Sequence, residues 1–126
     1  MQMNQMPSIS DAEWQIMKVL WAQSPLTANE IVEKLEGSCS WKPKTIKTLI
    51  GRLVTKKALS YHVDNRTYLY YPIVEEQECV LSESKSFIQK VFNGSVNCMI
   101  TNFLEYKQLS KKEIEDLKKI LNEKDI

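Results

Sequence analysis

Residues 41–57 combine an apolar stripe with a basic face, and this pattern constrains the fold more than any other part of the chain. Pro43 suits the first turn of a helix, where its missing N–H costs no hydrogen bond. The apolar residues repeat at the i, i+3, i+4 and i+7 spacing of one side of an α-helix. They are Ile46, Leu49, Ile50 and Leu53. We therefore predict a helix with one side on a core and the other side exposed.

The exposed side of this predicted helix is basic. Charged side chains are also the commonest way to solvate a helix, so the face alone is ambiguous. Its surroundings favour a polyanion, because residues 42–66 contain seven basic residues and one acid although the net charge of the chain is only +1. Lysine and arginine can bind phosphates, whereas threonine and arginine can also contact base edges. The exposed side carries Lys44, Lys47, Thr48, Gly51, Arg52 and Thr55.

Two short helices precede this stretch. Residues 10–13, Ser-Asp-Ala-Glu, and residues 27–30, Thr-Ala-Asn-Glu, each have the form of a capping box, in which the first and fourth residues bond to each other's backbone amides. We expect the first helix to end near Ala22 and the second to end before Gly37, which suits a left-handed C-cap.

A β-hairpin follows the basic helix. Residues 59–63 and 67–71 are rich in β-branched and aromatic residues, and Asp64, Asn65 and Arg66 lie between them. Asn tolerates the positive φ that a tight hairpin turn needs. Three short helices and then a hairpin are the layout of a winged helix-turn-helix, which places its third helix in the major groove and its wing on the phosphates.

The remaining residues predict three more helices, over about 75–92, from 95, and from the capping box at 110–113. We expect Ile114, Leu117 and Leu121 to face inward on the last one. So few residues bury little surface alone, and pairing with a second copy would resolve this. The chain is therefore predicted to be mostly α (α+β), with a winged-helix DNA-binding domain at 1–73 and a helical dimerisation domain at 74–126.

The sequence gives little support for a catalytic site or a metal site. The chain has one histidine, His62, and three glycines, too few for a Ser/His/Asp set or a phosphate loop. Three widely spaced cysteines favour neither a disulfide framework nor a metal site. No run is apolar enough to cross a membrane and no signal pattern begins the chain. We expect a cytoplasmic protein that is no enzyme and needs no cofactor.

The chain resembles the BlaI/MecI family of penicillinase repressors across nearly its whole length. The resemblance rests on Ile-Ser-Asp-Ala-Glu-Trp at 9–14, Trp-Lys-Pro-Lys-Thr-Ile-Lys-Thr-Leu at 41–49, Asn-Phe-Leu at 102–104 and Leu-Ser at 109–110. It implies a homodimeric repressor of a β-lactamase or penicillin-binding-protein operon, bound to double-stranded DNA at a dyad operator with TACA/TGTA-type half-sites.

The resemblance also assigns residues. It implies relief of repression by proteolysis between Asn102 and Phe103, through a membrane sensor-transducer pathway that responds to β-lactams, with no membrane insertion of this chain. Phe103 also fits an ordinary core position of a helix. The implied base readers are Lys44, Thr45, Thr48 and Arg52. The implied phosphate contacts are Thr27, Asn29, Trp41, Lys42 and Arg66, to which the basic face adds Lys47.

A second hypothesis is a helical protein-interaction adaptor, whose winged helix no longer binds DNA and presents its basic face to an acidic protein. Threonines and a glycine among the lysines have no evident use in such an adaptor. The two hypotheses differ in whether duplex DNA displaces the bound partner.

Overall fold

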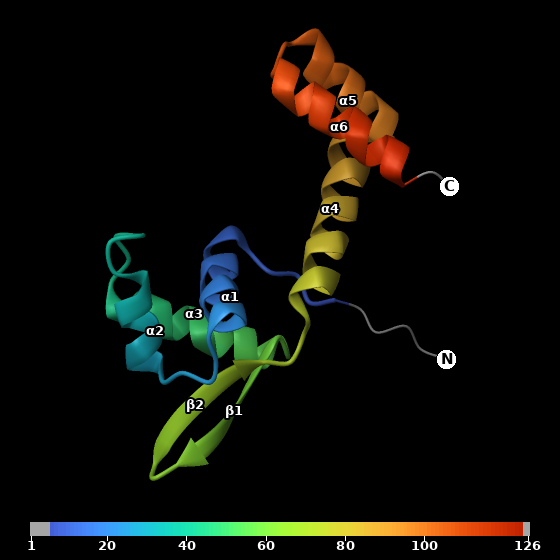
Figure 1. Cartoon of the computed structure of the whole chain (residues 1–126). Helices are drawn as coiled ribbons and strands as arrows, with labels where there is room; N and C mark the ends of the chain where they lie inside the picture. The colour runs from blue at the N-terminus through green and yellow to red at the C-terminus, as the bar shows by residue number, and fades with distance from the viewer. Residues whose placement is uncertain (1–5, 125–126) are drawn as a thin grey trace, which may run out of the picture. The chain divides into compact units, whose positions relative to one another are not determined.

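A computed structural model describes residues 6–124, which form two compact units, one up to Ser82 and one from Glu83. In chain order the elements are α1 (Asp11–Ala22), α2 (Ala28–Leu35), α3 (Pro43–Thr55), β1 (Leu59–Asp64), β2 (Thr67–Pro72), α4 (Glu76–Phe92), α5 (Val96–Glu105) and α6 (Lys111–Glu123) (Figure 1). This order confirms the predicted α+β winged helix followed by three helices.

The first unit packs α1, α2 and α3 around one apolar core, and the hairpin of β1 and β2 extends away from them (Figure 1). The apolar side of α3 is buried as predicted, with Ile46, Leu49, Ile50 and Leu53 almost fully inaccessible. The unit runs past residue 73 because Cys79, in the first turn of α4, is buried in the same core. The division into a DNA-binding domain at 1–73 and a dimerisation domain at 74–126 stays a prediction.

The base of the wing is fixed by a third short strand segment. The Leu26 amide donates to the Tyr70 carbonyl at 3.1 Å, and the Tyr70 amide donates to the Leu26 carbonyl at 2.8 Å. Backbone pairing of this kind joins the segment between α1 and α2 to β2. The start of α2 and the wing are therefore held next to each other.

Both predicted capping boxes of this unit form. The Ser10 hydroxyl accepts from the Glu13 amide at 3.1 Å, and the Ser10 amide donates to Glu13 Oε1 at 2.9 Å. Glu13 is also buried, and its carboxylate is paired with Lys56 at the end of α3. Lys56 Nζ donates in addition to the Ser8 carbonyl at 2.7 Å. Glu13 therefore caps α1 and, through Lys56, also connects α1 to the end of α3 and to the segment before α1.

The end of α3 is a Schellman motif with lysine in the left-handed position. The Ala58 amide donates to the Leu53 carbonyl at 2.9 Å, and the Lys57 amide donates to the Val54 carbonyl at 3.0 Å. Lys57 has φ +66°, a conformation that glycine adopts at much lower cost.

We expect Lys57→Gly to raise the free energy of unfolding by about 1 kcal/mol, because it removes the cost of a left-handed residue that carries a Cβ. Lys57→Ala is the control, since it removes the same charge and keeps the Cβ. Urea denaturation measures both variants. An equal gain from the alanine variant would show that the charge, not the backbone, was responsible.

The second unit exposes its apolar side chains. The left-handed Asn93 and Gly94 end α4, and the capping box of Ser110 and Glu113 opens α6, as predicted. Neither α5 nor α6 contains a buried residue in the single chain. The expectation that Leu121 faces inward was wrong. This residue is 64% exposed, because no other part of the described chain covers it.

Candidate nucleic-acid interface

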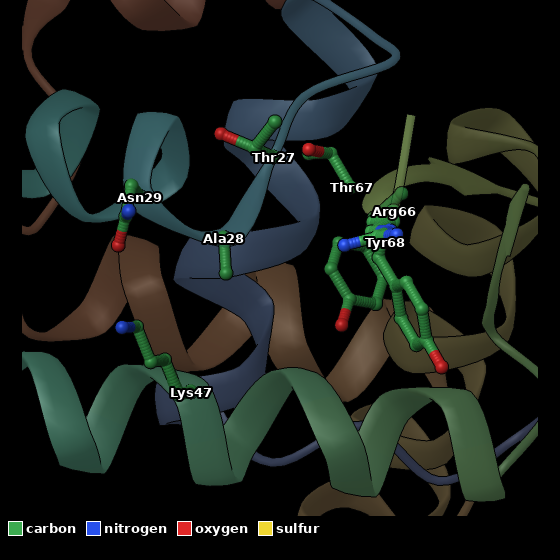
Figure 2. A pocket seen from close by; sticks show the side chains of 8 residues that line it. Thr27, Ala28, Asn29, Lys47, Arg66, Thr67 and Tyr68 are labelled. Atoms are coloured by element: carbon green, nitrogen blue, oxygen red, sulfur yellow. The ribbon is translucent and has the colours of Figure 1, made fainter. Parts of the chain in front are cut away.

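A groove lies where the start of α2, the middle of α3 and the wing meet (Figure 2). It has a volume of about 340 Å³, and we call it the wing groove. Figure 2 shows Lys47 extending from α3 toward Asn29, with Arg66, Thr67 and Tyr68 on the wing side. The groove is lined by Thr27, Ala28, Asn29, Lys47, Arg66, Thr67, Tyr68 and Tyr70.

The wing groove is electropositive from three sides. The first amides of a helix have no partner within the helix and carry a partial positive charge. Thr27 caps α2 by accepting from the Glu30 amide at 3.1 Å, so the amides of Ala28 and Asn29 remain at the groove. Lys47 adds a full charge from α3, and Arg66 adds another from the wing. This combination fits a phosphate group.

Arg66 lies in a two-residue turn with Asn65, since Asp64 and Thr67 form the last pair of the hairpin. Both turn residues have positive φ, +52° for Asn65 and +67° for Arg66, as in a type I′ turn. The left-handed arginine is unusual, because this position favours glycine. Arg66 lines the wing groove together with the start of α2.

A second groove, of about 230 Å³, runs along the exposed side of α3, and we call it the helix groove. The Thr48 hydroxyl donates to the Lys44 carbonyl at 3.0 Å, which restrains its side-chain rotamer and leaves the hydroxyl oxygen able to accept a further hydrogen bond. A threonine held in this way suits contact with a thymine methyl group. The groove is lined by Lys44, Thr45, Thr48, Leu49 and Arg52, and so contains all four implied base readers.

Trp41 and Lys42 line neither of these grooves. Lys42 is the N-cap residue of α3, and its exposed side chain makes no capping hydrogen bond. Trp41 is half-buried and packs against the core. Its indole ring therefore has a structural role in addition to the expected phosphate contact.

Sequence reasoning missed Tyr68 and Tyr70. Alternation along β2 places both on one face of the wing, and this period-2 pattern could have found them. Burial, together with the neighbouring Tyr68 and Tyr61, raises the pKa of the Tyr70 hydroxyl above its ordinary value.

Asn102 and Phe103 lie in α5, in the second unit. The Asn102 carbonyl accepts from the Tyr106 amide at 3.1 Å, and the Phe103 carbonyl accepts from the Gln108 amide at 2.8 Å. Asn102 also lines a groove of about 360 Å³ with Phe92, Cys98 and Glu105. The peptide bond between Asn102 and Phe103 is therefore inside a helix, with exposed side chains on both sides of it.

Among residues 6–124, no three histidine, cysteine or acidic side chains gather in a way that could hold a metal ion. No helix within the same residues is long and apolar enough to cross a membrane.

The three-helix core, the paired wing and the exposed side of α3 define a winged helix-turn-helix protein. The sequence model of the penicillinase repressor family matches residues 9–123, and the chain belongs to this family. The penicillinase repressor of Bacillus licheniformis is 42% identical over 121 residues, or 96% of this chain and 94% of that protein. The methicillin resistance regulatory protein MecI of Staphylococcus aureus (strain N315) is also 42% identical, over 96% of this chain and 98% of that protein.

Solved structures agree with this assignment. The solution structure of the DNA-binding domain of the repressor BlaI matches with a TM-score of 0.53 and 41% identity, covering 60% of this chain and 93% of that one. Monomeric BlaI of Bacillus licheniformis in complex with the blaP half-operator matches with the same TM-score, identity and coverage. The match covers a part of the chain about as long as the first unit.

Proposed function

We propose that this protein is a homodimeric transcriptional repressor that binds dyad operators of β-lactamase or penicillin-binding-protein resistance genes in the cytoplasm. The observation that carries the proposal is the pair of adjacent grooves on the first unit. The wing groove offers two cations and free amides to a phosphate, and the helix groove offers Lys44, Thr45, Thr48 and Arg52 to base edges. A half-operator complex of a relative supports the same use of the fold.

Dimerisation is proposed for the second unit. Its exposed apolar side chains are too many for a soluble surface without a partner. A second copy would cover them by symmetry, and the dimer would read two half-sites at once. These side chains are Phe87, Val91, Val96, Phe103, Leu104, Tyr106, Ile120 and Leu121.

Sedimentation of the full chain, alone and with a dyad duplex, tests this part. We expect two chains per particle in the free protein at micromolar concentration and two chains on each duplex. A single chain per particle at all concentrations, together with one chain per duplex, would contradict it.

Relief of repression is proposed to proceed by cleavage between Asn102 and Phe103, triggered by the membrane sensor-transducer pathway for β-lactams. Cleavage there separates the end of α5 and all of α6 from the rest of the chain. Loss of these apolar residues weakens the dimer, and operator affinity falls with it. The bond can be cut only after local opening of α5, because its carbonyl is bonded within the helix.

We expect Asn102→Ala to slow induced cleavage by about tenfold or more, since it removes a side chain next to the bond while alanine keeps the helix. Immunoblots after β-lactam addition measure the intact chain. Asn97→Ala, on the same helix and in the same groove, is the control. Normal cleavage and normal derepression of the Asn102 variant would place the cut bond elsewhere.

A further inference from the structure

Three tyrosines share one face of the wing, and we call Tyr61, Tyr68 and Tyr70 the tyrosine cluster. Tyr61 lies directly opposite Tyr70 in the hairpin, and Tyr68 is its diagonal neighbour. The rings of Tyr61 and Tyr68 are stacked, with centroids 4.3 Å apart and planes 7° apart. Tyr70 meets both rings edge-on. Aromatic pairs of this kind hold each other in place.

Two of the three rings in the tyrosine cluster are exposed to solvent, so packing against the core does not explain their presence. Tyr70 packs against the core, but Tyr61 is 38% exposed and Tyr68 is 46% exposed. Within residues 6–124, no hydroxyl of the cluster forms a hydrogen bond with the protein. Tyrosine at an interface typically uses its ring for packing and its hydroxyl for a partner.

The surroundings of Tyr68 identify that partner. Tyr68 lines the wing groove together with Lys47, Arg66 and the start of α2, so its phenol group lies among groups that attract an anion. Among the residues that the structure describes, no acidic side chain lines this groove. Resting on the proposed function, we propose that the Tyr68 hydroxyl donates a hydrogen bond to a phosphate oxygen of the operator backbone in the wing groove, and that Tyr61 is a positioning residue that holds the Tyr68 ring by stacking.

Operator titrations at several salt concentrations test this contact. Tyr68→Phe keeps the ring stack and removes one neutral donor, so we expect about a three- to tenfold loss of operator affinity. The slope of affinity against salt should not change, because no charge is removed. Tyr71→Phe is the matched control, since Tyr71 is the next tyrosine along β2 after Tyr70 and lies on the opposite face of the wing.

Tyr61 is tested by a pair of variants. Tyr61→Leu removes the ring stack and should weaken operator binding about as much as Tyr68→Phe does. Tyr61→Phe keeps the ring stack and should bind the operator with wild-type affinity. Thermal unfolding of each variant shows whether the wing still folds.

The outcomes separate this inference from the proposed function. If Lys47→Glu weakens operator binding by about 100-fold while Tyr68→Phe binds like wild type, the tyrosine contact is wrong and the repressor assignment stands. Equal losses in Tyr68→Phe and Tyr71→Phe would also overturn the contact. If wild-type protein does not prefer the operator at all, the proposed function itself fails.

Discussion

Replacement of Lys47 by glutamate is expected to weaken operator binding by about 100-fold. A hydrogen bond between charged groups contributes roughly 1.5–3 kcal/mol, and a carboxylate facing a phosphate adds repulsion to the loss. Each lost phosphate contact should also lower the slope of log affinity against log salt by about 0.9. Fluorescence anisotropy with a labelled dyad operator measures both quantities.

Lys47 is the sharpest choice because it is exposed, so the substitution should leave the fold unchanged. Lys18→Glu is the matched control, since Lys18 is exposed on α1 and lines neither groove. If the two variants lost affinity equally, the effect would be one of overall charge. An unchanged affinity and salt slope for Lys47→Glu would remove the wing groove from the binding surface.

The second large effect concerns stability. Lys56→Met should lower the free energy of unfolding by about 2–3 kcal/mol, because it leaves the Glu13 carboxylate buried without a cation. The Glu13 side chain is 2% exposed and the Lys56 side chain is 35% exposed, so solvent screening brings the expected loss somewhat below that of a fully buried pair. Urea denaturation of the full chain measures it.

The pH dependence of the free energy of unfolding should be weaker in this variant. Burial alone raises the pKa of Glu13, but the hydrogen bond and charge of Lys56, with the Ser10 amide, bring that pKa below its ordinary value. In the wild type the pair therefore stabilises the fold above the ordinary carboxyl pKa, and this stability is lost as pH falls through the lowered pKa. Without Lys56 two of the influences that lower this pKa are lost, so the pKa of Glu13 should rise, and Lys56→Met should lose less stability than wild type as pH falls below the ordinary carboxyl pKa.

The double variant Glu13→Gln/Lys56→Met removes the buried carboxylate together with its cation. It should be more stable than Lys56→Met alone, because no charge is left buried. Wild-type stability in Lys56→Met, with an unchanged pH profile, would mean that the ion pair contributes nothing.

Capping boxes, turn residues and apolar spacing predicted the fold well, because each of these patterns involves only residues that are close together in the sequence. The capping boxes at Ser10, Thr27 and Ser110 each opened a helix, and Asn65 predicted the turn of the wing. Period-3.6 spacing predicted which side of α3 is buried. These features depend on neighbours along the chain, which a sequence displays directly.

Features that depend on distant residues were not predictable. Glu13 reads as a cap, and only the folded chain shows that Lys56 holds its carboxylate in the core. The Leu26 pairing with Tyr70 and the stack of Tyr61 on Tyr68 likewise arise from register and tertiary packing. Leu121 reads as a core residue because periodicity reports an apolar face and not what covers it. The DNA-binding roles of the residues that line the wing groove and the helix groove stay predictions.

A direct titration tests whether the first unit reads operator sequence. The full chain is titrated against a labelled dyad operator and against a shuffled duplex of the same composition, in the presence of excess unlabelled nonspecific DNA. We expect the operator to bind about 1,000-fold more tightly than the shuffled duplex, with a steep dependence on salt. Equal affinity for the two duplexes, or capture of an acidic protein that duplex DNA cannot displace, would contradict the repressor and favour an adaptor.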